Sequence, residues 1–514
     1  MSDLLGRESW VAGPGADVGG RRVTVIGAAR SGLAAAKLFA AKGADVFLTE
    51  QGMLPEAVAA DLTARGIAYE DDGHTARAIN ADFFVVSPGV PTEAPLIQEA
   101  LKQDLPVYSE VEAASWFANG PIAAITGTNG KTTTTSLLGF IVQQSIAQQS
   151  IAQNDAAPSG RRVAIAGNIG RAFADAVLAS MNGEGDGAET TYVLEVSSFQ
   201  LDHVATFRPK AAVLLNVTPD HLNRYQHSYE RYVAAKLRLF ESQQPGDWLI
   251  YNHDDALVRD HALRIAAEQG TTPYAFSIDA EVPRGAFVRD DQIVLRLPTD
   301  APASNAAAQP TDSSTPPHPS SPTDSVLTDT VLMDTRDLAL RGRHNLYNSL
   351  AAAITARAIE IRSDVIRESL MSFEGVPHRL ETVRSVGGVR FVNDSKATNV
   401  NAVWYALESF SEPIVLIAGG RDKGNDYEPI KALVKERVKA VIGLGESGDK
   451  VLLELGDLAD TSARAYTMEE AVQYARLLAD PSDVVLLSPA CASFDMYANY
   501  EERGDDFKRL VHSL

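Results

Sequence analysis

The chain has 514 residues, of which 45% are hydrophobic and 22% charged, a composition that favours a globular protein over a disordered, collagenous or coiled-coil chain. At about 100–200 residues per domain, this length predicts about three domains. Acidic residues number 67 and basic residues 46, which gives a formal charge of −21 and argues against nucleic acid or anionic membrane surfaces as partners.

The sequence also predicts where in the cell the protein is located. The single cysteine, Cys491, excludes an internal disulfide and a cysteine-based zinc site. No stretch reaches the roughly 18 consecutive apolar residues of a membrane span, and the first residues, MSDLLGRESW, lack the basic-then-apolar layout of a signal peptide. We therefore expect a cytoplasmic protein without membrane insertion.

Short runs rich in β-branched residues recur along the chain, each followed by a helical pattern. The predicted strands are Val23–Ile26, Phe83–Ser87, Ile122–Thr126, Tyr192–Val196, Ala212–Asn216, Ile414–Ala418, Ala440–Gly443 and Val484–Ser488. Near-continuous apolar strands that alternate with helices are typical of parallel sheets covered on both faces. The sequence therefore predicts an α/β fold of three nucleotide-binding-like modules in series, covering residues 1–109, 110–374 and 375–514.

Two segments of the middle module look inserted, near residues 143–162 and 298–335. The first contains a tandem QQSIA repeat followed by a polar stretch. The second is dense in Pro, Ser, Thr and Asp and has no Lys or Arg, so it cannot bury enough apolar surface to offset its ordering entropy. We predict a disordered surface loop there, with an interdomain linker as the alternative, and we expect no chemistry from either segment.

The first predicted strand leads into Gly27-Ala28-Ala29-Arg30-Ser31-Gly32, which is similar to the start of a dinucleotide-binding unit. Glu50 ends the next strand about 20 residues further on, where such units carry an acidic residue. Ala29 replaces the middle glycine of the pattern, so the evidence for NAD is weak. Ser87-Pro88-Gly89 follows another strand of the same module and would add a second loop facing the same ligand.

The strongest motif is Gly127-Thr128-Asn129-Gly130-Lys131-Thr132-Thr133, directly after a predicted strand and before a helical run. Such a turn at a helix N-terminus points backbone N–H groups at a phosphate. Lys131 would reach the outer phosphates of a nucleoside triphosphate, and the Thr132 hydroxyl would bind Mg²⁺. Ile125 stands at the first glycine of the strict pattern, and a purely structural turn is the alternative.

Polar residues also follow the next two strands. Glu195 ends one strand and His221 follows the other, so both would lie beside the glycine-rich turn as Mg²⁺ ligands or as groups that support them. Taken alone, His221 would be interpreted as an ordinary histidine of a loop. Lys236, in the predicted helix Tyr229–Phe240, reads alone as a solvated lysine.

The last third carries three polar loops, each directly after a predicted strand. They are Asn393–Asn399, Gly419–Gly424 and Ser488–Asp495, and they are rich in Lys, Thr, Ser and Asp. Loops of this kind at the carboxyl edge of a parallel sheet suit a small anionic substrate. Each one singly is also compatible with an ordinary polar loop.

Together, these motifs resemble the Mur ligase family of ATP-dependent amide-forming enzymes of peptidoglycan synthesis, from about Arg22 to Leu510. The Gly-Thr-Asn-Gly-Lys-Thr turn marks the whole family, and Asn393–Asn399 and Ser488–Ser493 resemble its D-glutamate-adding member. The resemblance implies a Rossmann-like module at each end and a P-loop-type ATPase sheet between them. It also implies a monomeric ligase that joins D-glutamate to UDP-N-acetylmuramoyl-L-alanine through an acyl phosphate, using ATP and Mg²⁺.

The resemblance further assigns residues to ligands, module by module. For the UDP-sugar, in place of NAD, they are Arg30, Ser31, Ser87, Pro88 and Gly89. For ATP they are Gly127, Thr128, Asn129, Gly130, Lys131, Thr132, Thr133, Asn345, Asn348, Arg379 and Asp394. For D-glutamate they are Lys396, Thr398, Lys423, Ser493 and Tyr500. For the metal they are Thr132, Glu195, His221 and Lys236 as a carbamate, and the catalytic set is Lys131, Asn168, His221 and Lys236.

Three other functions stay open at this point. An NAD-dependent oxidoreductase would explain the first glycine loop but not the Gly-Lys-Thr turn. A regulatory nucleotide-binding protein would have kept the fold without catalysis, although Lys131, Glu195, His221 and Lys236 are all intact. Within the family, a ligase for another amino acid is the remaining alternative.

Overall fold

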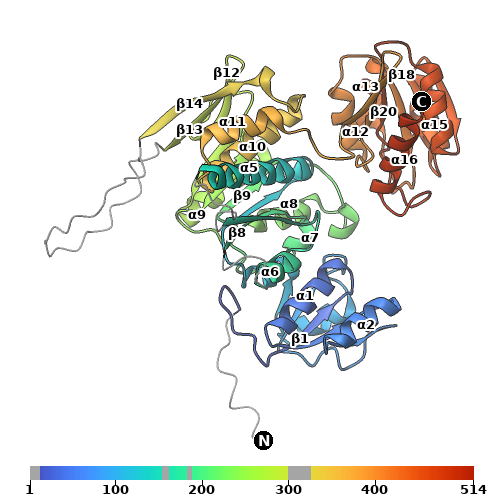
Figure 1. Cartoon of the computed structure of the whole chain (residues 1–514). Coiled ribbons are helices and arrows are strands. Elements are labelled where there is room, and N and C mark those ends of the chain that lie inside the picture. Colours follow the sequence, from blue (N-terminus) through green and yellow to red (C-terminus); the bar gives the residue numbers. More distant parts are fainter. Residues whose placement is uncertain (1–11, 153–160, 182–187, 299–325) are drawn as a thin grey trace, which may run out of the picture. The chain divides into compact units, whose positions relative to one another are not determined.

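The computed structural model describes residues 12–152, 161–181, 188–298 and 326–514 (Figure 1). The chain forms two compact units, residues 1–338 with 347–372 and residues 339–346 with 373–514. The first unit holds two sheets and the second unit one. Alternating strands and helices build all three sheets, which confirms the predicted α/β class.

The N-terminal module is built on a parallel sheet with the strand order β3-β2-β1-β4-β5. Its elements are β1 (Arg22–Ile26), α1 (Arg30–Ala41), β2 (Asp45–Thr49), α2 (Glu56–Ala64), β3 (Ala68–Glu70), β4 (Phe83–Val86), α3 (Pro95–Lys102) and β5 (Val107–Ser109). Apolar clusters cover both faces of this sheet, one around Val25 and Phe83 and the other around Phe84. Helix α4 (Glu110–Ser115) follows β5 and packs against a helix of the next module, α6 (Phe173–Met181).

The middle module has nine strands in the order β14-β13-β12-β11-β10-β9-β6-β8-β7. They are β6 (Ile122–Thr126), β7 (Arg161–Gly167), β8 (Glu189–Glu195), β9 (Ala211–Leu214), β10 (Trp248–Asn252), β11 (Thr272–Ser277), β12 (Gly285–Arg289), β13 (Gln292–Pro298) and β14 (Leu327–Asp334). The remaining helices are α5 (Lys131–Ala152), α7 (Ser198–Leu201), η1 (Leu222–Tyr225), α8 (Tyr229–Leu237), η2 (Arg238–Phe240), α9 (Ala256–Gln269), η3 (Thr335–Asp337), α10 (Arg343–Ala358) and α11 (Ser363–Ser372).

Two features of this sheet differ from the prediction. Its pairings are parallel from β7 to β12, but β12, β13 and β14 pair antiparallel, so the sheet is mixed rather than parallel. The predicted disordered loop 298–335 was also wrong at its end, because Leu327–Asp334 is the edge strand β14 (Figure 1). Leu332 and Met333 bury their side chains there, and Asp329 pairs with Arg296 at 2.6 Å. Residues 299–325 lie outside the described part of the chain.

The other inserted segment is divided between a helix and residues outside the described range. The QQSIA repeat, residues 143–152, forms the last turns of α5. Residues 153–160 are not among the described ones, and Arg161 already belongs to β7. The repeat therefore lengthens a helix.

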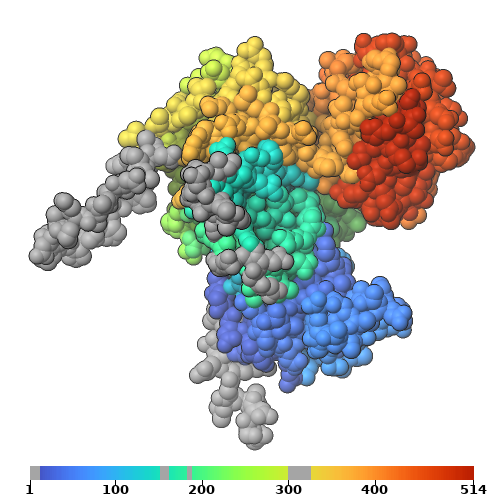
Figure 2. Space-filling model, viewed as in Figure 1, coloured from blue at the N-terminus to red at the C-terminus, as the bar shows by residue number. Residues whose placement is uncertain are grey.

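The second unit contains a sheet with the order β15-β16-β20-β17-β18-β19. Its elements are β15 (Glu381–Val386), β16 (Val389–Asn393), α12 (Val400–Glu408), β17 (Ile414–Gly419), α13 (Glu428–Arg437), β18 (Val438–Leu444), α14 (Gly448–Leu455), η4 (Gly456–Leu458), β19 (Thr461–Ala465), α15 (Met468–Leu478), β20 (Val484–Leu487) and α16 (Tyr500–His512). One apolar cluster joins α12, α13 and α14 to one face of the sheet, and another joins α15 and α16 to the other face. In the space-filling view, the darkest red surface of this unit is α16 (Figure 2).

No helix within the described ranges is long and apolar enough to cross a membrane.

Candidate active site

The glycine-rich turn joins β6 to the N-terminus of α5 and is braced by residues that follow β9. The Asn129 backbone N–H donates to Asn216 Oδ1 at 2.9 Å, and Asn216 Nδ2 donates back to the Asn129 carbonyl at 3.1 Å. Thr128 Oγ1 likewise donates to the Thr218 carbonyl and accepts from its backbone N–H, both at 3.0 Å. This double bracing holds the backbone N–H groups of the turn at the start of the helix, where they suit a phosphate.

A carboxylate lies directly beside the turn. Glu195, the last residue of β8, is 2% exposed and accepts from Thr132 Oγ1 at 2.7 Å. Its other carboxylate oxygen accepts from Asn168 Nδ2, also at 2.7 Å. The structure therefore brings Thr132 and Glu195, which were predicted from two strand ends, together with Asn168, which the family resemblance implied.

Two lysines converge on the first carbonyl of the turn. Lys236 Nζ from α8 donates to the Gly127 carbonyl at 2.8 Å, and Lys131 Nζ donates to the same oxygen at 2.9 Å. Lys236 is 2% exposed. Burial, and after it the positive charge of Lys131, hold the pKa of Lys236 well below its usual value. Lys236 is thus a buried amine with a strong tendency to be neutral, and not the solvated helix lysine that its sequence alone suggested.

His221 occupies a strained backbone position just before η1. Its φ of +51° lies in the left-handed region, which non-glycine residues rarely adopt. The Asp220 carboxylate accepts from the His221 backbone N–H at 2.8 Å, and the imidazole ring lies 5.2 Å from the ring of Phe199. Strain of this kind is commonly retained at functional sites.

The predicted nucleotide residues belong to both units. Asn348, in the first unit, lies so close to the turn that a Cβ at Gly130 would collide with its Oδ1 atom, and Oδ1 also accepts from Thr134 Oγ1 at 3.2 Å. Asn345 lies in the first turn of α10, where its Nδ2 donates to the Arg341 carbonyl at 2.8 Å. Asn345 belongs to the second unit, as do Arg379 and Asp394.

In the N-terminal module, the two predicted UDP-sugar loops lie side by side at the carboxyl ends of β1 and β4. The Ser87 backbone N–H donates to the Ile26 carbonyl at 2.9 Å, and a Cβ at Gly27 would lie 3.0 Å from the Ser87 side chain. Glu50 Oε2 accepts from the Ala28 backbone N–H at 2.5 Å. Glu50, the acidic residue that the glycine pattern predicts, therefore binds the backbone of the glycine loop.

The second unit collects the polar loops that follow β16, β17 and β20, which are neighbours in its sheet. Asp394 is buried and accepts from Ser488 Oγ at 2.8 Å. Burial raises the pKa of Asp394 to about 7 against the opposing positive charge of Arg379. Asn425 Nδ2 donates to the Ala490 carbonyl at 3.0 Å, which joins the loop after β17 to the loop after β20.

Within this cluster, Lys396 Nζ donates to the Tyr500 hydroxyl at 3.2 Å and lies 5.0 Å from the centre of its ring. Ser493 is buried, Thr398 is partly exposed and Lys423 is exposed. The cluster thus presents a mixture of ammonium and hydroxyl groups at one edge of the sheet.

The sequence did not single out the residue that ties these loops together. Arg503 of α16 is 2% exposed, and it donates to the Ser395 carbonyl at 2.8 Å and to the Cys491 carbonyl at 3.1 Å. No sequence pattern predicts such a contact, because every residue has a backbone carbonyl and the partners of Arg503 could therefore be residues of any type. In the first unit, two other side chains that bind backbone groups were also not singled out. They are Asn216, which binds the backbone of Asn129, and Arg224, which donates to the Pro88 and Val90 carbonyls.

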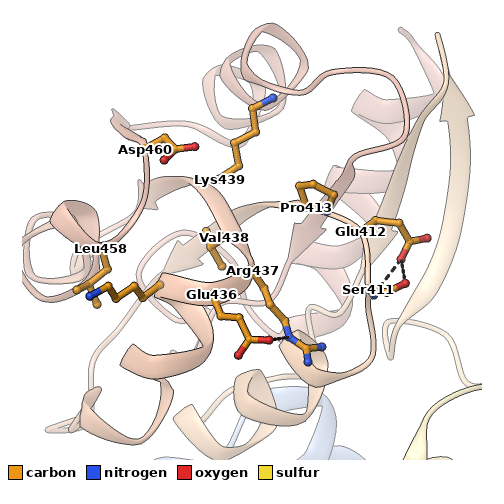
Figure 3. Close-up of a pocket in the computed structure, with 10 residues that line it drawn as sticks. Ser411, Glu412, Pro413, Glu436, Arg437, Val438, Lys439, Leu458 and Asp460 are labelled. Carbon is orange, nitrogen blue, oxygen red and sulfur yellow. Dashed lines mark hydrogen bonds and ion pairs between the residues drawn. The ribbon is translucent and has the colours of Figure 1, made fainter.

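The pocket drawn in Figure 3 is a different place. It has a volume of about 530 Å³ and lies where β17 and β18 begin, which is the opposite edge of the sheet from the polar loops. Two of its cations pair with acidic neighbours, Arg437 with Glu436 at 3.4 Å and Lys439 with Asp480 at 2.6 Å. None of the predicted site residues lines it.

The oxygen donors beside the turn fit a hard divalent cation. No group of three or more His, Cys, Asp or Glu side chains that could hold a metal occurs in the ranges that the structure describes. Mg²⁺ does not require such a group, because it is commonly held by one or two carboxylates together with substrate phosphates and water. The Glu195 carboxylate and the Thr132 hydroxyl supply donors of this type.

The fold and the turn define a multi-module α/β protein of the P-loop type. Three family models match the chain, the MurD N-terminal domain at residues 22–95, the Mur ligase middle domain at 125–356 and the Mur ligase glutamate ligase domain at 378–491. The chain belongs to the Mur ligase family and is an ATP-dependent amide-forming ligase.

Curated relatives match over nearly their whole length. A protein of Salinibacter ruber named UDP-N-acetylmuramoylalanine--D-glutamate ligase is 54% identical over 493 residues, which cover 96% of this chain and 98% of the relative. A protein of the same name from Chloroherpeton thalassium is 41% identical over 507 residues, covering 97% and 99%.

Solved structures agree on the fold. UDP-N-acetylmuramate-alanine ligase MurC of Thermotoga maritima aligns with a TM-score of 0.52 at 17% identity, covering 96% of this chain and 99% of that one. MurF of Acinetobacter baumannii aligns with a TM-score of 0.53 at 15% identity, covering 90% and 91%. At these identities the likeness concerns the fold alone, and it supports the predicted three-module architecture.

Proposed function

We propose that this protein is a cytoplasmic, monomeric ligase that adds D-glutamate to UDP-N-acetylmuramoyl-L-alanine with cleavage of ATP to ADP and phosphate. The observation that carries the proposal is the 54% identity, over 96% of the chain, to a relative whose name states this activity. The intact turn with Lys131 and Thr132, next to Glu195, supports it.

Each module takes one substrate in this proposal. Residues 1–109 bind the UDP-sugar through Arg30, Ser31 and the Ser87–Gly89 loop, and residues 110–374 bind ATP. Residues 375–514 bring D-glutamate to the loops that carry Lys396, Thr398, Lys423, Ser493 and Tyr500. Ammonium and hydroxyl donors suit the two carboxylates of that substrate.

The first chemical step is the activation of a carboxylate, which is itself a poor electrophile. A carboxylate oxygen of the L-alanine residue attacks the γ-phosphorus, ADP leaves, and an acyl phosphate forms. The backbone N–H groups of residues 127–133 hold the phosphates in place, and the Lys131 ammonium offsets their charge. For this purpose Lys131 must swing from the Gly127 carbonyl, where it lies in the structure, to the phosphates.

Mg²⁺ held by Glu195 and Thr132 would supply charge neutralisation at the phosphate oxygens. The Asn168 amide and the Thr132 hydroxyl both donate to Glu195, so they fix the direction of its lone pairs. The imidazole ring of His221 lies next to Phe199. In this proposal it orients the reacting carboxyl group.

Lys236 takes part as a carbamate. A neutral amine, not an ammonium, attacks carbon dioxide, and the burial that lowers the Lys236 pKa favours the neutral form. The product is an anion with two oxygens, which adds a carboxylate-like metal ligand from α8. His221 and this carbamate complete the proposed metal site.

In the second step, the amine of D-glutamate attacks the acyl phosphate carbon. The tetrahedral intermediate collapses with loss of inorganic phosphate, and the new amide bond remains. One oxygen atom of the original carboxylate leaves with that phosphate.

Transfer of this oxygen gives a direct test. UDP-N-acetylmuramoyl-L-alanine labelled with ¹⁸O in its carboxylate is incubated with the enzyme, ATP, Mg²⁺ and D-glutamate. We expect one ¹⁸O atom in each phosphate released and a sugar nucleotide heavier by one glutamyl unit. Phosphate without the label would exclude the acyl phosphate route, and a product carrying another amino acid would exclude D-glutamate as the substrate.

A further inference from the structure

Arg30 joins the N-terminal module to a loop of the middle module. It is the first residue of α1, directly after the glycine loop, and its guanidinium reaches the loop Gly167–Gly170. Nη1 donates to the Gly170 carbonyl, and Nη2 donates to the Gly167 and Asn168 carbonyls at 3.2 and 3.3 Å. One side chain therefore fixes three carbonyls within four residues.

That loop carries a residue of the proposed catalytic centre. The Asn168 backbone N–H donates to the Glu195 carbonyl at 2.8 Å, and its side-chain amide donates to the Glu195 carboxylate. Glu195 in turn accepts from Thr132. A continuous chain of contacts thus runs from Arg30 through Asn168 and Glu195 to the phosphate-binding turn.

The loop is also held at its far end. Glu110, the first residue of α4, is 1% exposed and accepts from the Ala174 backbone N–H at the start of α6 at 2.6 Å. Arg30 and Glu110 therefore bracket residues 167–174 from two sides.

A second arginine makes the reverse connection at the same junction. Arg224 of η1, three residues after His221, donates to the Val90 carbonyl at 2.8 Å and to the Pro88 carbonyl at 3.4 Å. Its side chain is 12% exposed and lies over the ring of Phe199 at 4.8 Å. Arg224 of the middle module thus binds the loop predicted to hold the UDP-sugar. In the other direction, Arg30 of the N-terminal module binds the loop that carries Asn168.

We propose that Arg30 is a positioning residue for catalysis, which acts by orienting Asn168 and through it Glu195. This inference rests on the proposed function and deepens it, because it assigns Arg30 a second task in addition to its contact with the UDP-sugar. The turn itself is braced by Asn216 and does not depend on Arg30. Loss of Arg30 should therefore disturb the reacting centre more than the binding of ATP.

The test uses Arg30→Met, which keeps the length of the side chain and removes its donors. Arg30→Lys retains one charged group, and Arg264→Met removes an exposed arginine that pairs with Glu268 and contacts His261 on the same helix, α9. Hydrogen–deuterium exchange of residues 165–172 is measured together with kcat and the KM for ATP. Because Arg30 is largely exposed, all three variants should fold, which thermal unfolding verifies.

We expect Arg30→Met to lower kcat about tenfold or more, as fits the loss of hydrogen bonds from a charged donor, with the KM for ATP within about twofold of wild type. Exchange of the Gly167 and Asn168 amides should quicken, Arg30→Lys should recover part of both effects, and Arg264→Met should match wild type. An unchanged kcat, or equal losses in kcat and in ATP binding, would overturn the proposal. If wild type shows no ligase activity, the proposed function fails, and unchanged amide exchange in Arg30→Met would separately overturn the positioning role.

Discussion

Lys236 Nζ and Lys131 Nζ donate to the same carbonyl oxygen, that of Gly127, at 2.8 and 2.9 Å. Two ammonium groups so close together repel each other, and Lys236 is also shut off from water. One of the two is therefore better accommodated as a neutral amine. Burial selects Lys236, while Lys131 remains the cation available to phosphate.

Replacing Lys131 by Ala should lower the rate of phosphate release at least about a hundredfold, because no other cation of the turn offsets the γ-phosphate charge. Lys102→Ala is the matched control, since Lys102 is 73% exposed on α3. Steady-state phosphate release measures both variants. An active Lys131→Ala enzyme would refute the role of the turn and favour a protein whose function does not involve ATP cleavage.

The carbamate on Lys236 should be visible without any turnover. Protein incubated with ¹³C-labelled bicarbonate is expected to show a carbamate carbonyl resonance by NMR, because the lowered pKa of Lys236 leaves its amine neutral and nucleophilic. Lys236→Met should lose this resonance. If the resonance persists in Lys236→Met, the modified lysine is a different one, and if wild type shows none, Lys236 acts unmodified.

Glu195→Gln should raise the Mg²⁺ concentration needed for half-maximal activity by about tenfold, because an amide keeps the contact with Thr132 but carries no charge. Glu189→Gln serves as the control, as Glu189 begins the same strand and is exposed. Titration of activity with Mg²⁺ at saturating substrates gives the comparison. If Glu195→Gln and Glu189→Gln require the same Mg²⁺ concentration, Glu195 is not a metal ligand.

Arg503→Met should raise the KM for D-glutamate several-fold and leave the KM for ATP nearly unchanged, because Arg503 ties two of the loops proposed to bind the amino acid. It should also lower the melting temperature of the second unit, since buried carbonyls lose their donor. Arg509→Met, on the same helix and 69% exposed, controls for loss of charge. A D-glutamate KM equal to that of wild type would show that Arg503 only stabilises the fold.

Glu110 should make stability depend on pH. Burial raises its pKa to about 7 from an ordinary value of 4.5, so between those limits the folded state binds more protons than the unfolded state. Glu110 alone should therefore lower the free energy of unfolding by about 3 kcal/mol as the pH rises through this window.

The fall should be smaller by this amount in Glu110→Gln but not absent, because the pKa of Asp394 is also raised to about 7 and its contribution remains. Glu99→Gln, an exposed change on α3, should match wild type. Thermal or urea unfolding of the three proteins at pH 5 and pH 8 measures the difference. The same pH dependence in Glu110→Gln and wild type would contradict the assignment.

The fold was largely predictable because buried parallel strands read as unbroken apolar runs. Every residue of Phe83–Val86 and of Val484–Leu487 is buried, and a short, continuous apolar run of this kind is typical of a strand covered on both faces. Strand β14 escaped prediction because only Leu332 and Met333 of its residues are buried, and it follows a segment rich in Pro, Ser and Thr. Its place in the sheet depends on pairing with β13, which is a tertiary property.

The candidate site likewise has a part that the sequence predicts and a part that it does not. The turn at 127–133 is local in sequence, so its chemistry could be predicted from spacing alone. Arg30 contacts residues about 140 positions further along the chain. Its partners there are backbone carbonyls, so the types of those residues give no sign of the contact. The convergence of Lys236 and Lys131 likewise becomes apparent only once α8 packs beside the turn.

The central claim is that phosphate release from ATP depends on D-glutamate. The most direct measurement is the rate of phosphate release with ATP, Mg²⁺ and UDP-N-acetylmuramoyl-L-alanine, comparing D-glutamate, L-glutamate and no amino acid. Our account predicts rapid release with D-glutamate alone. Equal release with L-glutamate, or release that needs a different amino acid, would contradict it.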